Sequence, residues 1–195
     1  MRKSAITRDD ILPMDVYGRE RRARRAAVTE MKRNRRVHVG PYATFYFESY
    51  DTMWHQVHEM LYIEKGGEDQ IADELAAYNP LIPKGDELVA TVMFEIEDPV
   101  RRARELTRIG GVENTMSMTV DGVAVKGVSE EDTERTNADG KASSVQFVHF
   151  KLPPAVAAKF KTPGTKVVVS IDHTHYSHMA GMPEEVRAAL AQDLD

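Results

Sequence analysis

The sequence of 195 residues contains no cysteine. This absence excludes a disulfide scaffold, thiolate ligation of zinc or of an iron–sulfur cluster by this chain, and a cysteine nucleophile. No apolar run approaches the ~20 residues of a transmembrane helix. The N-terminal segment MRKSAITRDD also lacks the apolar core of a signal peptide. We therefore expect a soluble cytoplasmic protein that does not contact a membrane.

Two common catalytic loops are also missing. The glycine pairs in GGEDQ and IGGVE have neither the spacing nor the lysine of a phosphate-binding loop. No Gly-x-Ser-x-Gly elbow is present. With 42% hydrophobic and 29% charged residues, the length favours one domain over residues 1–195.

The charge is unevenly distributed along the chain. The net charge is −5, but residues 1–36 hold 12 basic and 5 acidic side chains, which leaves the remainder strongly acidic. A basic N-terminal helix over about residues 13–34 is expected to dock on an acidic α+β body. Such a segment can also neutralise an acidic partner or the phosphates of nucleic acid.

Helical spacing sorts the residues of this N-terminal helix into two faces. Val16, Ala23, Ala27 and Met31 fall on one stripe, which is expected to face the body. Basic side chains lie toward the other side, where a solvated surface is the simplest interpretation. The candidate partner-binding residues are Arg21, Arg22, Arg25 and Lys32.

The remaining pattern alternates short strands with helices. Asp121-Gly122 suits a type I′ hairpin turn, and Asp98-Pro99 suits the start of a helix. Hairpins outnumber the long crossovers that a parallel sheet requires. The predicted fold is α+β, with a mainly antiparallel sheet of about seven strands and helices packed against it. The acidic segment 129–142 is either a long hairpin tip or a mobile lid.

Histidines concentrate in SIDHTHYSHMAG, which follows a strand. Imidazole nitrogens and a nearby carboxylate are common ligands of zinc or non-haem iron. The candidate metal ligands are Asp172, His173, His175 and His178. Because the spacing matches no named zinc motif, a polar loop with surface histidines is the alternative.

A second histidine pair, His55 and His58, lies one helical turn apart beside Glu59. Its order differs from that of the zincin motif, and an exposed helix face is expected. Among the carboxylates, Glu48 ends one predicted strand, and Glu95 and Glu97 share a face of another. These glutamates are either a general acid/base pair or structural ion-pair partners.

Several segments taken together suggest a family. They occur in order along nearly the whole chain: ITRDDILP, VGPYATFYFE, Asp51-Thr52, YNPLIP, ELVATVMFEIEDP, SSVQFVHF and DHTHY. In combination they resemble an uncharacterised bacterial family of domains of unknown function, often encoded beside rubrerythrin-like and iron–sulfur oxidoreductase genes. The resemblance implies a redox or oxidative-stress setting and a partner of that type.

The resemblance also ranks the candidate site residues. The matching positions are Arg8, Asp9, Asp10, Gly40, Thr44, Glu48, Asp51, Thr52, Asn79, Pro80, Glu95, Asp98, Asp172, His173 and Tyr176, whereas His55, His58, His175 and His178 lie outside the pattern. The catalytic candidates are therefore Glu48, Glu95, Asp172, His173 and Tyr176.

Three functional hypotheses follow. The leading one is a cytoplasmic accessory or binding protein that docks on a redox partner through its basic helix. The second is a metal-dependent enzyme that uses zinc or iron at Asp172, His173 and nearby carboxylates. The third is nucleic-acid binding by the arginine face, which is disfavoured because no aromatic residues interleave with the basic ones.

Overall fold

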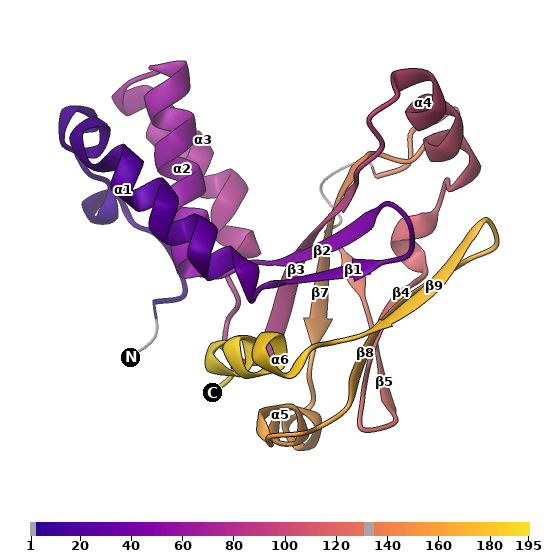
Figure 1. Cartoon of the computed structure of the whole chain (residues 1–195). Helices are drawn as coiled ribbons and strands as arrows, with labels where there is room; N and C mark the ends of the chain where they lie inside the picture. Colours follow the sequence, from indigo (N-terminus) through magenta and orange to yellow (C-terminus); the bar gives the residue numbers. More distant parts are fainter. Residues whose placement is uncertain (1–2, 131–134) are drawn as a thin grey trace.

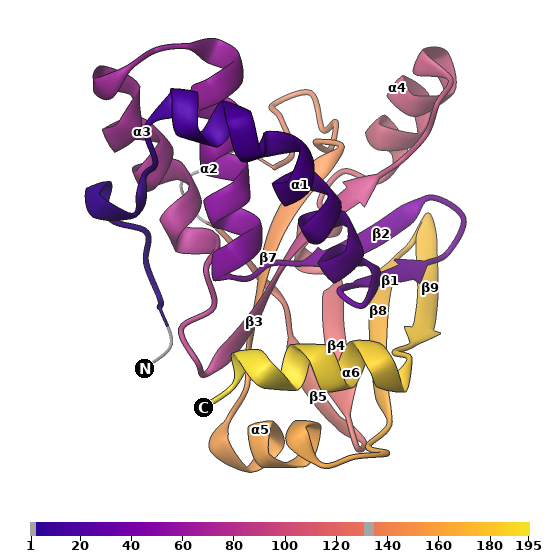
Figure 2. The same ribbon diagram turned by 60° about the vertical axis from the view of Figure 1, so that its left-hand side comes forward.

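The computed structural model describes residues 3–130 and 135–195. These residues form two antiparallel sheets (Figure 1, Figure 2). The first, sheet A, has the order β1-β2-β3-β7-β6, with strands β1 (Arg36–Val39), β2 (Ala43–Phe47), β3 (Glu87–Phe94), β7 (Val145–Lys151) and β6 (Val128–Ser129). The second, sheet B, has the order β5-β4-β8-β9, with strands β5 (Val123–Lys126), β4 (Met116–Val120), β8 (Val167–His173) and β9 (Tyr176–Gly181).

The predicted α+β class is confirmed, but the single sheet of about seven strands is replaced by two sheets. The chain passes from β5 in sheet B to β6 in sheet A at Gly127, where an added Cβ would lie 2.6 Å from a methyl carbon of Val148. A half-buried strand has the same alternating pattern in one large sheet as in two stacked ones. The pattern alone therefore did not reveal the division.

The main hydrophobic core lies between the two sheets. Phe45 and Phe47 of β2 and Phe150 of β7 are almost fully buried there, opposite Met118 of β4 and Val169 of β8. The phenylalanine rings lie 6.3–6.5 Å apart between centroids. Aromatic pairs at this spacing add to the stabilisation from area burial.

A layer of helices covers part of the other face of sheet A. It consists of α1 (Met14–Arg33), α2 (Tyr50–Glu64) and α3 (Glu68–Tyr78), which gather on one side of β1, β2 and β3 (Figure 1). A second hydrophobic cluster joins Met53, Val57 and Leu61 of α2 to Val89 of β3. The helices thus leave the outer face of sheet A only partly covered.

Three shorter α-helices lie outside this layer. They are α4 (Pro99–Arg108), α5 (Pro154–Lys161) and α6 (Glu184–Leu190), of which α5 and α6 lie together near the C-terminus (Figure 2). The predicted start of α4 is confirmed, since Asp98 accepts a hydrogen bond from the Arg101 amide. No described helix is long and apolar enough to cross a membrane.

The N-terminal helix forms as expected but packs through a different face. Tyr17 is fully buried against α2, whereas Ala23 and Ala27 of the predicted inner stripe are exposed. The tyrosine ring lies 5.0 Å from the ring of His58 and 6.2 Å from that of Trp54. These ring contacts bury more surface than an alanine stripe could, so they decide the rotation of α1.

The acidic segment 129–142 is described in part. Residues 131–134 of the predicted hairpin tip or lid lie outside the described residues. The remainder folds back on the body, because Thr136 forms a bridge with Ala142 and its hydroxyl donates to Glu113 at 2.9 Å. The Thr136 hydroxyl also accepts from the Gly111 amide at 2.8 Å.

Candidate functional site

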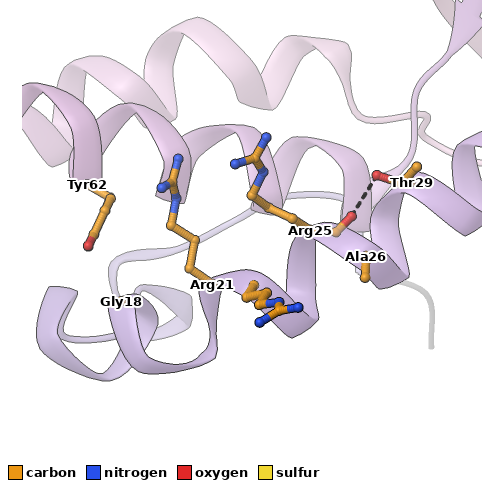
Figure 3. Close-up of a pocket in the computed structure, with 7 residues that line it drawn as sticks. Gly18, Arg21, Arg25, Ala26, Thr29 and Tyr62 are labelled. Atoms are coloured by element: carbon orange, nitrogen blue, oxygen red, sulfur yellow. Dashed lines mark hydrogen bonds between the residues drawn. The ribbon is translucent and has the colours of Figure 1, made fainter.

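A basic groove runs along α1. It has a volume of about 440 Å³ and is lined by Gly18, Arg21, Arg22, Arg25, Ala26, Thr29 and Tyr62. Six of these residues belong to α1. Side chains three or four residues apart lie on the same side of a helix, so these residues share one side of α1. Figure 3 shows Arg21 and Arg25 extending in the same direction from the helix, with Tyr62 of α2 beside them.

Gly18 allows α1 to lie close to Tyr62 of α2 at one end of the groove. A Cβ at Gly18 would lie 2.9 Å from the Tyr62 ring. The guanidinium carbon of Arg21 lies 5.0 Å from the centroid of the same ring, which is a cation–π distance. Tyr62 therefore presents an aromatic surface next to a cation.

One residue of the groove, Arg21, forms an ion pair that joins α1 to α2. Arg21 donates to both carboxylate oxygens of Glu59, at 2.8 and 2.9 Å, and the Tyr17 hydroxyl donates to Glu59 at 2.8 Å. These hydrogen bonds, led by that of Arg21, lower the pKa of the Glu59 carboxyl to about 2. Burial and the hydrogen bond to Glu59 raise the pKa of Tyr17, and burial lowers that of His55.

Two arginines of the groove have no such partner. On α1, Arg19, Arg24 and Arg33 pair with acidic residues one turn away. In contrast, neither Arg22 nor Arg25 forms an ion pair with any described residue. Their uncompensated charge lies at the groove, where it favours an anionic partner.

The groove continues toward the other end of α1. A second hollow of about 350 Å³ shares Arg25 and Thr29 with the first and adds Lys32, His55 and Ile63, among others. The side chain of Ile63 is 60% exposed. The combined surface, which we call the α1 groove, is thus cationic with apolar margins. Four predicted partner-binding residues, Arg21, Arg22, Arg25 and Lys32, line it.

A buried carboxylate lies on the outer face of sheet A. Glu48 follows β2, and its side-chain oxygens accept hydrogen bonds from the hydroxyls of Thr52 at 2.6 Å and Thr91 at 2.7 Å. Ser49 and Thr52 together cap the N-terminus of α2, whose dipole favours an anion at this position. The sequence candidate Glu48 is therefore a fixed carboxylate rather than a mobile surface group.

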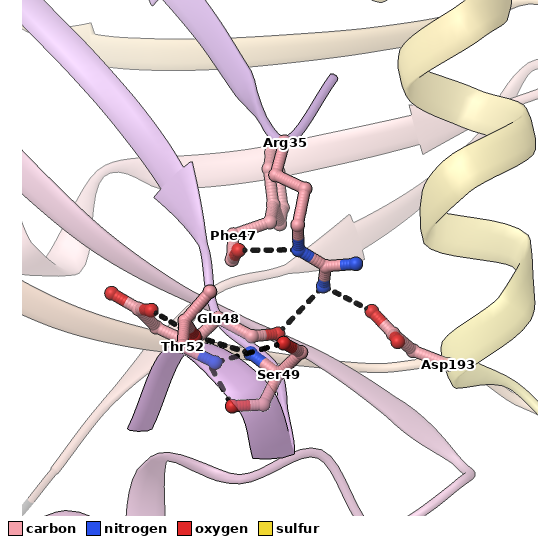
Figure 4. Close-up of polar contacts among 6 residues, drawn as sticks. All are labelled: Arg35, Phe47, Glu48, Ser49, Thr52 and Asp193. Atoms are coloured by element: carbon pink, nitrogen blue, oxygen red, sulfur yellow. Dashed lines mark hydrogen bonds and ion pairs between the residues drawn. The ribbon is translucent and has the colours of Figure 1, made fainter. Parts of the chain in front are cut away.

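Arg35 contacts the main chain of Glu48 rather than its carboxylate. Its guanidinium donates to the carbonyl oxygens of Phe47 at 3.0 Å and Glu48 at 2.8 Å. Its ion-pair partner is Asp193, after α6. Figure 4 shows that the Glu48 carboxylate turns away from this guanidinium. The charge of Arg35 is thus already neutralised by a different residue.

The second candidate carboxylate lies on the same face of the sheet. Glu95 accepts hydrogen bonds from the hydroxyls of Thr44 at 2.7 Å and Tyr46 at 2.8 Å. His38 contacts Thr44 through its Nδ1 at 2.9 Å. Glu48 and Glu95 belong to two separate hydroxyl networks, so the structure does not join them as one acid/base pair.

The predicted histidine cluster occupies the β8–β9 hairpin. The Nε2 of His173 bonds to the carbonyl oxygen of Gly110 at 3.1 Å, and its Nδ1 accepts from the amide of His175 at 3.1 Å. Asp172 accepts instead from Ser177 at 3.0 Å. Within residues 3–130 and 135–195, no group of three or more His, Asp or Glu side chains is placed to hold a metal ion, and His178 does not join the others.

The hydroxyl of Tyr176 bonds to main-chain groups of the neighbouring sheet. Its hydroxyl donates to the carbonyl oxygen of Val39 at 2.7 Å and accepts from the amides of Tyr42 at 3.2 Å and Ala43 at 3.0 Å. All three partners belong to the β1–β2 hairpin or its turn. Tyr176 therefore ties the edge of sheet B to that of sheet A.

Comparison with known proteins places the chain in a family. Residues 5–194 match the family described as "Protein of unknown function (DUF3501)". The chain belongs to the DUF3501 family. A crystal structure of a protein of unknown function from Burkholderia pseudomallei is 39% identical, with a TM-score of 0.91 over 98% of this chain and 100% of that one. No curated protein matches the chain.

The family resemblance seen in the sequence is thus confirmed: DUF3501 is an uncharacterised family of domains of unknown function. The match covers both sheets and the helical layer. Neither match assigns a reaction, a ligand or a partner to the DUF3501 chain.

His58 of this DUF3501 protein is fully buried, so the predicted exposed helix face is wrong at this residue. Its Nε2 accepts from the Leu12 amide at 3.1 Å, and its Nδ1 bonds to the carbonyl oxygen of Trp54 at 2.7 Å. Burial lowers the pKa of His58. The segment before α1 covers this side of α2, which helical periodicity in α2 alone could not show.

His149 is a histidine that the sequence patterns did not single out. His149 of β7 contacts Glu87 at 2.9 Å and Glu130 at 3.0 Å, one through each ring nitrogen. The hydrogen bond to Glu87, followed by that to Glu130, raises the pKa of His149 against the effect of burial. The alternation of SSVQFVHF does place His149 on the outer face of sheet A. Glu87 becomes its diagonal neighbour only once the β3–β7 register is known.

Proposed function

We propose that this protein is a cytoplasmic accessory protein that binds an acidic surface of a protein partner through the α1 groove. The observation that carries the proposal is that Arg22 and Arg25 line the groove without an ion-pair partner among the described residues. The neighbouring arginines Arg19, Arg24 and Arg33 are each paired on the helix itself.

The chemistry of the groove fits a carboxylate-rich partner. The planar guanidinium group binds carboxylates through two parallel hydrogen bonds, which orients the partner as well as attracting it. Tyr62 and the exposed Ile63 supply apolar contact beside the cations. Such an arrangement combines electrostatic steering with apolar contact.

The family resemblance suggests which partners to test first. A redox setting is part of the proposal, with rubrerythrin-like and iron–sulfur proteins as the candidates. The absence of cysteine leaves this chain without a thiol of its own for such chemistry. Its role would therefore be to hold or position the redox partner.

The decisive experiment reverses the charge of the free arginines. The variant Arg22→Glu/Arg25→Glu should lose at least tenfold in affinity for the acidic partner, because it places like charges across the interface. Arg21 is left unchanged, since its ion pair with Glu59 holds α1 on α2. Binding would be measured by titration of the purified partner at two salt concentrations.

The matched control is Arg19→Glu/Arg33→Glu. It makes the same charge change on the same helix, at two exposed residues that do not line the groove. Equal losses in both double variants would contradict a specific groove. Tight binding of duplex DNA, with log affinity falling by ~0.9 per phosphate contact against log salt, would replace the acidic partner by nucleic acid.

A further inference from the structure

A small cavity lies where α2 meets the outer face of sheet A. Its volume is about 170 Å³, and it is lined by Lys32, Glu48, Met53, Gln56, Tyr78, Leu81, Thr91, Met93, Val145 and Phe147. Half of these side chains are apolar, namely Met53, Leu81, Met93, Val145 and Phe147. Glu48 brings a carboxylate next to them.

The negative charge of Glu48 has no cationic partner in the described part of the chain. Its oxygens each accept one neutral hydroxyl, from Thr52 and Thr91. Arg35, which donates to the main-chain oxygen of Glu48, is committed to Asp193 and to main-chain oxygens. A buried carboxylate is costly unless it is paired. Each carboxylate oxygen also keeps a free lone pair, because an ionised carboxylate offers about four acceptor positions.

A lysine completes the charge pattern of the cavity. Lys32, at the end of α1, lines the cavity but forms no ion pair with Glu48 or with any other described residue. The cavity wall thus presents one anion and one cation that do not satisfy each other. A ligand that carries both charges would pair with each of them.

The volume limits the ligand to a small molecule. A cavity of ~150 Å³ is large enough for benzene, so about 170 Å³ suits a body of similar size. Met53, Leu81 and Phe147 provide apolar contact for it. Small-molecule sites usually combine such a lining with a few fixed polar groups that set orientation.

We propose that this cavity binds a small apolar amino acid, whose ammonium group pairs with Glu48 and whose carboxylate pairs with Lys32. The Thr52 and Thr91 hydroxyls hold the Glu48 carboxylate in place for this contact. The site adjoins one end of the α1 groove, with which it shares Lys32 and Gln56. Its ligand is a small molecule, so the proposal does not depend on a protein partner.

Leucine is the probe, and methionine methyl groups report where it binds. In protein labelled with ¹³C at the methionine methyls, leucine should produce saturable shifts at Met53 and Met93, which line the cavity. Met116 and Met118 lie in the core between the sheets and should not shift. No saturable shift, or shifts at all four methionines alike, would overturn the assignment.

Two variants test the role of the carboxylate. Glu48→Gln should weaken leucine binding at least tenfold. Glu95→Gln should leave it unchanged, since Glu95 is held by the Thr44 and Tyr46 hydroxyls in the same manner but does not line the cavity. Equal affinity in Glu48→Gln and the unmodified protein would overturn the proposal.

The unmodified protein provides a test that does not depend on variant stability. Leucine should bind at least tenfold more tightly than 4-methylpentanoate, which lacks the ammonium group. It should also bind more tightly than 3-methylbutylamine, which lacks the carboxylate. If 4-methylpentanoate bound more tightly than leucine, Glu48 would recognise no ammonium group and the proposal would fail.

Discussion

Arg21 of α1 and Glu59 of α2 form a two-point ion pair that fastens the basic helix to the body. Both side chains are partly shielded, with 29% and 14% of their surfaces exposed. The pair neutralises one arginine of the α1 groove and fixes the direction of the helix that carries the others. Attachment of the helix and presentation of its free charge therefore depend on different arginines.

This pair predicts an acid-sensitive contact. The pKa of Glu59 is lowered from 4.5 to about 2 by Arg21 first. A lowered carboxyl pKa gives stability that is fully present above the unfolded value and is lost as the pH falls toward the folded one. The free-energy difference between the unmodified protein and Glu59→Gln should therefore shrink between pH 4.5 and 2. Urea unfolding across that range measures it, and a constant difference would contradict the assignment.

His149 predicts the opposite dependence on pH. Its pKa is raised above 6.5 by Glu87 and then Glu130. A raised histidine pKa gives stability that is fully present below the unfolded value and is lost as the pH rises through the folded one. The unmodified protein should thus be more stable than His149→Gln near pH 5.5, with a smaller advantage above pH 8. A difference that grows with pH would be inconsistent with the Glu87 and Glu130 contacts.

We expect removal of the Tyr176 hydroxyl alone to destabilise the protein strongly. Removing it in Tyr176→Phe leaves the Val39 carbonyl and two amides without their partner, which should cost about 2 to 3 kcal/mol of unfolding free energy. Tyr42→Phe is the control, since the Tyr42 hydroxyl bonds to no described residue. If both variants unfold at the same denaturant concentration, the Tyr176 contacts are not stabilising.

His173 gives a test of the metal hypothesis. Both of its ring nitrogens are engaged within the protein, by Gly110 and by the His175 amide. Asp172→Ala/His173→Ala should therefore leave the zinc and iron content of the purified protein unchanged. Elemental analysis measures this directly. About one metal per chain that disappears in the variant would restore the enzyme hypothesis.

Local signals in the sequence predicted much of the fold. The Asp98-Pro99 start of α4 and the Asp121-Gly122 turn between β4 and β5 depend on neighbouring residues alone. Asp121 and Gly122 both have positive φ, as a type I′ turn requires. Such features are fixed before any long-range contact forms, so composition and spacing reveal them.

Long-range packing was predicted less well. Helical spacing in α1 could not show that the Tyr17 ring would pack against Trp54 and His58, or that Arg21 would pair with Glu59. All three partners lie on α2, about 40 residues further along the chain. The surroundings of the candidate residue Glu48 could not be predicted for the same reason. Glu48 was predicted at the end of a strand. The Thr91 hydroxyl that donates to it comes from β3, and only the tertiary structure shows this contact.

The ion pair between Arg35 and Asp193 has a consequence for synthesis of the chain. These residues are 158 positions apart, and Arg35 is buried at the start of the first hairpin. During translation, the hairpin leaves the ribosome long before its counter-ion has been made. Until then the Arg35 guanidinium lacks this counter-ion, and burying an unpaired charge is costly. The corner of sheet A around Arg35 therefore gains its charge pairing only after the segment that carries Asp193 has been synthesised.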